Sequence, residues 1–158
     1  MDIKINNEDG KFKFRVCGIL KFNNKYLVVK INNNKFYCLP GGHVELGEDT
    51  NEVVVREMEE ELSFKVKIEK MLCVVQNFFK DENGKTFHEL GYYYVVTPED
   101  EKSVNAKDYE RDELDKGKIQ HLDFKWVTLE ELKNLDFRPK VIVEQLSNDK
   151  FVNIIVKD

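Results

Sequence analysis

One helical segment stands between β-forming runs, and this order limits the folds that the chain can adopt. Residues 50–62 contain no Gly or Pro, and Asp49 or Thr50 can serve as the N-cap. Before them, residues 12–22 and 25–31 are rich in β-formers and are separated by two asparagines, which predicts a hairpin.

After the helical segment, residues 64–79 and 86–96 predict two more strands joined by a turn. Residues 98–118 are polar and without pattern, and we predict a long surface loop there. Residues 119–129 predict a strand. Together the elements predict an α+β fold, layered as an α/β/α sandwich around a mixed β-sheet.

The C-terminal part predicts two short helices and a last strand or tail. Thr128 and Glu131 form a capping-box pattern that predicts the first helix, and the second is expected to start near Pro139. Residues 151–156 predict the strand or tail. Because the sequence shows no internal repeat and no linker, we expect one domain over residues 1–158.

Composition restricts the partners and the compartment. The formal net charge of −5 argues against non-specific binding to nucleic acid or to an anionic membrane, so we expect neither partner. Three widely spaced cysteines (Cys17, Cys38 and Cys73) fit reduced thiols better than a disulfide framework, and no run approaches a membrane span. We therefore expect a cytoplasmic protein, with a homodimer left open.

Four glutamates lie within residues 57–61, although like charges this close weaken a helix. At about 100° per residue, Glu57, Glu60 and Glu61 share one face. A second face is apolar and is expected to pack on a sheet; it holds Val54, Val55, Met58 and Leu62. A third face, which is expected to be exposed to solvent, holds Glu52 and Glu59. Three converging carboxylates suit a hard cation such as Mg²⁺, and the alternative is an ordinary solvated acidic face.

The surrounding residues favour the cation. The segment LPGGHVELGEDTNEVVVREMEEELSF resembles the Nudix box, G-x5-E-x7-R-E-U-x-E-E-x-G-U, where U is a bulky aliphatic residue. It starts at Gly42 and ends at Phe64, and eight of the nine specified positions fit if Phe64 is accepted as U. Ser63 is the exception, because a glycine there supports a left-handed helix end, in which serine costs about 1 kcal/mol or more.

The resemblance implies a Nudix-type fold in which the box forms a loop-helix-loop. It also implies roles for single residues: Glu57, Glu60 and Glu61 would bind Mg²⁺, or Mn²⁺ in its place, together with the Gly41 carbonyl. Glu57 would in addition activate the attacking water. The residues that orient this cluster would be Arg56 and Glu48, and Gly42 would allow a tight turn.

Other residues are open to two interpretations. In several Nudix enzymes a loop glutamate completes the metal site or acts as base, and Glu110 or Glu113 would fill that role here. The three histidines (His43, His88 and His121) lack a metal-ligand spacing and are expected to be structural, with His43 the best exception. The aromatic runs at 78–79 and 92–94 could stack on a base or face the core.

The resemblance implies a Mg²⁺-dependent pyrophosphohydrolase that cleaves a phosphoanhydride bond in a nucleoside diphosphate linked to another moiety. The alternative is a Nudix-fold module that senses a nucleotide and regulates a partner without turnover. The intact glutamate row favours the enzyme. Lys80, Asp81 and Glu82 occupy the positions where ADP-ribose or dinucleoside polyphosphate hydrolases carry a characteristic Pro or Tyr, so neither subgroup is indicated.

Overall fold

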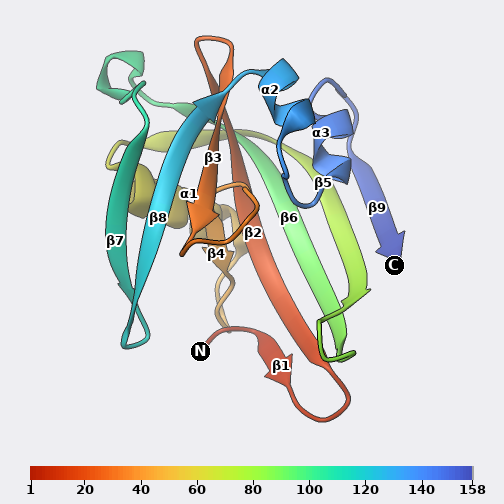
Figure 1. Cartoon of the computed structure of the whole chain (residues 1–158). Coiled ribbons are helices and arrows are strands. Elements are labelled where there is room, and N and C mark those ends of the chain that lie inside the picture. The colour runs from red at the N-terminus through yellow and green to blue at the C-terminus, as the bar shows by residue number, and fades with distance from the viewer. Residues whose placement is uncertain (158) are drawn as a thin grey trace.

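A mixed sheet of nine strands forms the centre of the computed structural model, which describes residues 1–157 (Figure 1). The main order of strands is β7-β8-β3-β2-β6-β5-β9, and β1 and β4 both pair with β2. The pairs β2/β6 and β5/β9 are parallel, and the other pairs are antiparallel. The strands are β1 (Lys4–Asn6), β2 (Lys11–Phe22), β3 (Lys25–Ile31), β4 (Gly41–His43), β5 (Val66–Lys80), β6 (Thr86–Pro98), β7 (Tyr109–Asp115), β8 (Lys118–Val127) and β9 (Val152–Lys157).

Both predicted hairpins are confirmed. Asn23 and Asn24 have φ values of 50° and 62°, the left-handed conformation that a two-residue hairpin turn requires. In the turn from β5 to β6, the Asp81 carboxylate accepts hydrogen bonds from the backbone N–H groups of Asn83 and Lys85, both at 2.9 Å. Such local bonds are the reason why Asn and Asp mark turns in a sequence.

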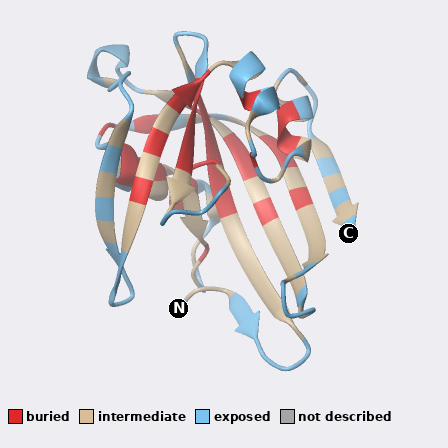
Figure 2. Cartoon of the chain, in the orientation of Figure 1, coloured by how far each residue is buried: buried red, intermediate tan, exposed pale blue. Residues whose placement is uncertain are grey.

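Helices cover both faces of the sheet, as predicted. Helix α1 (Thr50–Leu62) packs on one face, and the short helices α2 (Leu129–Asn134) and α3 (Val141–Gln145) pack on the other (Figure 1). The buried residues form two clusters, one against each layer (Figure 2). Neighbouring residues of a strand alternate between them, because Val16 belongs to the α1 cluster and Cys17 to the other.

Helix α1 has the predicted bounds. The Asp49 side chain accepts a hydrogen bond from the Glu52 N–H at 2.9 Å and caps the first turn. Ser63 ends the helix in the left-handed conformation, with φ 64°. The predicted apolar face needs one correction: Val53 is fully buried, whereas Val55 lies at the border and is half-buried.

The predicted loop over residues 98–118 is wrong in its second half. This segment contains a 3-10 helix (Glu101–Ser103) and then strand β7, which pairs antiparallel with β8. β7 is an edge strand in which charged residues occupy both faces and the apolar Leu114 is exposed, so the apolar alternation that reveals most strands is missing. Backbone pairing and stacking of Tyr109 on Phe124, with ring centroids 4.6 Å apart, hold it in place.

Candidate active site

Two glycines bring strand β4 against strand β2 and against the helix. A Cβ on Gly41 would lie 2.0 Å from the Val16 carbonyl oxygen, so only glycine permits this approach to β2. A Cβ on Gly42 would lie 2.6 Å from each carboxylate oxygen of Glu57. The missing side chain of Gly42 therefore leaves the space that the Glu57 carboxylate occupies.

The three predicted carboxylates run from the interior of the protein to its surface. Glu61 is buried, with 7% of its surface exposed; the Glu57 side chain is 22% exposed and that of Glu60 is 61% exposed. The Glu61 Oε2 atom is enclosed and has no hydrogen-bond partner within residues 1–157. A buried carboxylate without a partner is strongly unfavourable in the protein alone, and a cation would relieve this.

The negative charges of the three carboxylates repel one another. Burial and the nearby Glu60 carboxylate together raise the pKa of Glu57 to about 7, although the Arg56 guanidinium acts in the opposite direction. Burial also raises the pKa of Glu61 well above its usual range, with added repulsion from Glu57 and Glu113. These carboxylates have the oxygen donors and the excess negative charge that a divalent cation requires.

Arg56 ties the helix to the loop that precedes it. Its guanidinium donates to the Glu48 carboxylate, with a second contact of 3.4 Å from Nη2 to Oε2. It also lies 3.5 Å from Glu57 Oε1 and 3.9 Å from Glu60 Oε1. Glu48 in turn accepts from the Glu45 N–H at 3.1 Å. Arg56 thus holds one side of the row in place.

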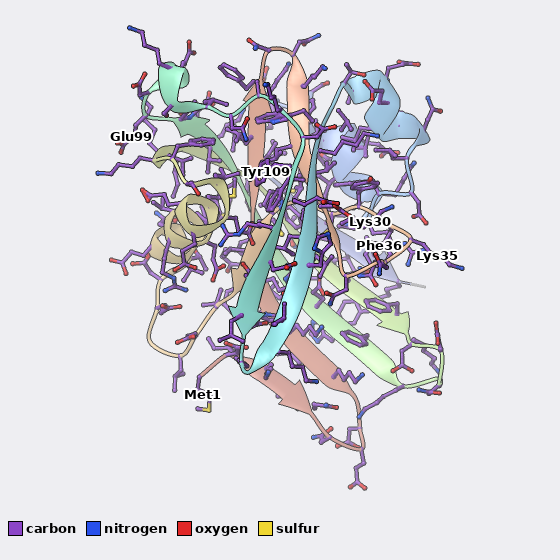
Figure 3. The ribbon with its side chains drawn as sticks, turned by 60° about the vertical axis from the view of Figure 1, so that its left-hand side comes forward. Met1, Lys30, Lys35, Phe36, Glu99 and Tyr109 are labelled. Atoms are coloured by element: carbon purple, nitrogen blue, oxygen red, sulfur yellow. The ribbon has the colours of Figure 1, made fainter. Side chains whose placement is uncertain are left out.

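Strand β7 contacts the C-terminal end of α1, which the sequence did not reveal. The Tyr109 hydroxyl (Figure 3) donates to the Glu61 carbonyl at 3.0 Å, and the Arg111 guanidinium donates to the Glu60 carbonyl. Glu113 follows two residues later on the same face, and burial raises its pKa. A Tyr-x-Arg-x-Glu alternation over residues 109–113 was the available signal.

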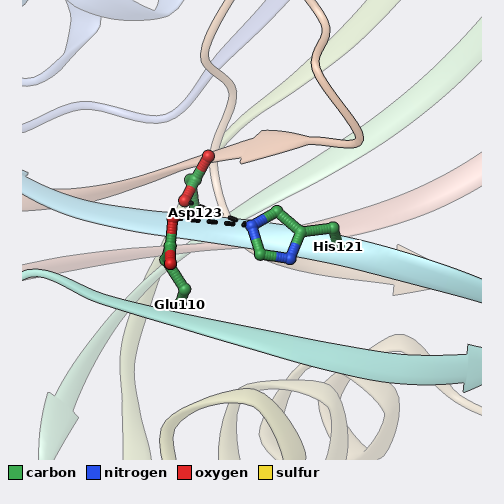
Figure 4. A group of neighbouring side chains, drawn as sticks. All are labelled: Glu110, His121 and Asp123. Carbon is green, nitrogen blue, oxygen red and sulfur yellow. Dashed lines mark ion pairs between the residues drawn. The ribbon is translucent and has the colours of Figure 1, made fainter.

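The two candidate glutamates of this segment lie on opposite faces of β7. Glu113 faces the α1 row, whereas Glu110 belongs to an exposed cluster with His121 and Asp123 (Figure 4). His121 Nε2 lies 3.5 Å from Glu110 Oε1 and 3.5 Å from Asp123 Oδ1, and its Nδ1 lies 2.7 Å from Asp112 Oδ1. The hydrogen bond with Asp112 raises the pKa of His121, so the cluster favours the protonated imidazole.

An open groove runs along the outer side of α1 beside Ile68. It has a volume of about 710 Å³, and its lining includes Val55, Arg56 and Glu60 but neither Glu57 nor Glu61. Glu57 and Glu61, whose pKa values burial raises, do not line this groove. We therefore centre the site between β4, α1 and β7.

A sequence model of the NUDIX domain matches residues 12–146, which include β4, the whole of α1 and β7. The chain belongs to the NUDIX family. The resemblance in the box is thereby confirmed.

The relatives of this NUDIX chain agree with that assignment. An ADP-ribose pyrophosphatase of Methanocaldococcus jannaschii is 36% identical over 98 residues, which make up 60% of this chain and 58% of that protein. The chain is also similar to a MutT mutator protein of Bacillus halodurans (18% identity, TM-score 0.64, covering 92% of this chain and 90% of that one). A MutT NUDIX hydrolase of Burkholderia pseudomallei gives 23% identity and a TM-score of 0.58, with 86% and 98% covered.

The two aromatic runs have different surroundings in this NUDIX domain. Tyr93 and Tyr94 lie in the two cores, while Phe78 stacks on His88 and Phe79 on Phe87. Among the described residues, no helix combines the length and the apolar character needed to span a membrane.

Proposed function

We propose that the chain is a metal-dependent pyrophosphohydrolase that cleaves the phosphoanhydride bond of a nucleoside diphosphate linked to another moiety. The observation that carries the proposal is the buried, unpartnered carboxylate of Glu61 in a row with Glu57 and Glu60. The carboxylates of this row repel one another and would also repel an anionic nucleotide. A binding module without turnover has less use for such a row than an enzyme that binds a metal ion.

Glu57, Glu60 and Glu61 would hold Mg²⁺, or Mn²⁺ in its place, with the Gly41 carbonyl as a further oxygen ligand. When bound, the cation would neutralise the carboxylates and the diphosphate and polarise the phosphorus that water attacks. Arg56 orients Glu57 and Glu60 through its contacts with both side chains.

Glu57 is the proposed general base. Its carboxylate lies against Gly42 and projects from a helix that is capped at its start and packed on the sheet, so its position is well defined. Glu113 is the alternative base or an additional ligand, because it faces the same row from the neighbouring strand. Glu110 is the weaker candidate, since it pairs with His121 on the opposite face of β7.

ADP-ribose is the first substrate to test. The M. jannaschii relative is named for it, and ADP-ribose is a nucleoside diphosphate linked to a sugar. Residues 80–82 lack the subgroup signature, so the substrate does not follow from them. We also propose a cytoplasmic location, because Cys17, Cys38 and Cys73 are free thiols.

The test is a substrate panel of ADP-ribose, nucleotide sugars, nucleoside triphosphates and dinucleoside polyphosphates, each with Mg²⁺ and with a chelator. Products are separated by ion-exchange chromatography. We expect Mg²⁺-dependent release of a nucleoside monophosphate from at least one nucleoside diphosphate conjugate, and its loss in Glu57→Gln. Tight nucleotide binding without turnover of any member would replace the enzyme by the sensor.

A further inference from the structure

Strand β2 carries three basic residues in alternation, Lys11, Lys13 and Arg15, on one face of the sheet. Cys17 continues this face and lies in the core on the side of α2 and α3, away from α1. Phe12 and Phe14 alternate with the basic residues and therefore point to the other face. A row of cations on one face is unexpected in a chain with a net charge of −5.

Arg15 makes no direct polar contact. Its Nε atom is enclosed without a hydrogen bond, and within residues 1–157 its guanidinium takes part in no hydrogen bond or ion pair, although the Glu89 carboxylate acts on its charge at longer range. The residue as a whole keeps part of its surface accessible. A guanidinium with an enclosed, unsatisfied Nε is unfavourable in the free protein, and an anion that reaches its accessible part would provide the missing acceptors.

Strand β4 supplies a second unpaired nitrogen at the same place. His43 lies directly opposite Arg15 in the β2–β4 pairing, and its Nε2 atom is also enclosed without a partner in the part of the chain that is described. Two unsatisfied nitrogens on adjacent strands point to a ligand with several acceptor oxygens, for which phosphate is well suited.

This position is next to the carboxylate row but on the other side of β4. His43 directly follows Gly42, whose missing side chain makes room for the Glu57 carboxylate. Among the described strands β4 pairs only with β2, so its second edge has no strand partner. A diphosphate that passes round this edge would have one phosphate at the row and the next at Arg15.

We propose that Arg15 and His43 form an anion subsite that binds the second phosphate of a diphosphate substrate, with Lys13 adding positive charge. The inference rests on the proposed function for the position of the first phosphate. It assigns each phosphate its own source of positive charge: the cation held by α1 for one, and the guanidinium of β2 for the other.

The experiment measures binding of α,β-methylene-ADP, whose bridging carbon prevents cleavage, by calorimetric titration in the presence of Mg²⁺. We expect Arg15→Gln to raise the Kd roughly 10- to 100-fold, as for the loss of a charge-assisted bidentate contact, and Arg15→Lys to raise it less. Lys67→Gln removes the same charge from an exposed position on β5 and should leave the Kd unchanged.

Thermal midpoints separate a binding role from a structural one. Because Arg15 makes no hydrogen bond or ion pair in the described part of the free protein, Arg15→Gln should keep or raise the midpoint without ligand while it weakens binding. A lower midpoint with an unchanged Kd would overturn the subsite, as would failure of the wild type to bind the probe at millimolar concentration.

The same titration distinguishes the two proposals. If the wild type hydrolyses no member of the substrate panel but binds the probe in an Arg15-dependent way, the subsite stands and the proposed function fails. If the wild type is active and Arg15→Gln keeps its Kd and KM, the subsite alone fails.

Discussion

Two groups of acidic side chains lie on opposite faces of β7, and their surroundings differ. The α1 row includes Glu61, which is buried and has an unpaired oxygen in the described chain. The other group surrounds His121 at the surface, where Glu110, Asp112 and Asp123 lie within 3.5 Å of its ring nitrogens. Similar residue types thus form one group that lacks a basic partner at its buried end and one that is built around a basic side chain.

The number of carboxylates therefore does not identify a functional site. Burial without a counter-charge does, because a folded protein keeps such an arrangement at the expense of its stability.

The largest effect is expected on catalysis. Glu57→Gln should lower kcat by roughly 100-fold or more on whichever substrate the panel finds, since it removes both a ligand oxygen and the proposed base. Glu110→Gln, in the exposed group, should stay close to the wild-type rate. Steady-state kinetics and Mg²⁺ titration of these two variants and of Glu113→Gln would show which glutamate acts as the base. An equal loss in Glu113→Gln with normal Mg²⁺ affinity would move the base to β7.

Packing under the two groups should differ as well. Leu62 is 5% exposed and anchors the end of α1, so Leu62→Ala should lower the free energy of unfolding by about 2 to 5 kcal/mol. Ile119 on β8 is 73% exposed, and Ile119→Ala should change it by less than about 0.5 kcal/mol. Chemical denaturation measures both, and an unchanged midpoint for Leu62→Ala would show that the helix is rotated.

Without metal, the α1 row should destabilise the fold as the pH rises. Glu57 has a folded-state pKa of about 7 against a usual 4.5, so the folded state binds its proton more tightly. The contribution of Glu57 to stability is therefore most favourable below pH 4.5 and is lost as the pH rises to about 7, and Glu61 adds to this loss in the same direction.

Glu61→Gln should reduce that fall and stabilise the metal-free protein at pH 8 by about 1 to 3 kcal/mol. It should also gain less stability from added Mg²⁺ than the wild type. Denaturation between pH 5 and 8, in chelator and in Mg²⁺, provides the measurement. A variant less stable than the wild type in chelator would contradict the prediction.

The end of α1 offers a smaller test. Ser63 has a φ of 64°, a conformation that glycine adopts without penalty. Ser63→Gly should therefore raise the free energy of unfolding by about 1 kcal/mol and leave kcat unchanged. A loss of activity would mean that Ser63 contributes to the row as well as to the turn.

The smallest effect is expected in the exposed group. The hydrogen bond with Asp112 raises the pKa of His121 above 6.5, so its stabilising contribution is complete below pH 6.5 and disappears as the pH rises through the folded-state pKa. NMR titration should show this raised pKa and its return towards 6.5 in Asp112→Asn. An unshifted pKa of His121 in the wild type would show that the surrounding carboxylates do not stabilise its protonated form.

Local chemistry made the helix and the hairpins predictable. Asn23 and Asn24 adopt a left-handed turn by themselves, Asp49 caps the helix that follows it, and the capping box of Thr128 and Glu131 forms as expected. Strand β7 could not be predicted in the same way, since its partner is β8 and charged residues occupy both of its faces. Its pairing depends on backbone hydrogen bonds with β8, and the Tyr-x-Arg-x-Glu alternation is its only local trace.

Glu57, Glu60 and Glu61 share a helix face whatever surrounds the helix, because the period of an α-helix already fixes this in the sequence. The packing of the whole chain sets how far each is buried, brings Glu113 and not Glu110 to the row, and places Arg15 opposite His43. These facts depend on strands that are distant in the chain, and desolvation and pairing act between such strands, beyond the reach of any local pattern.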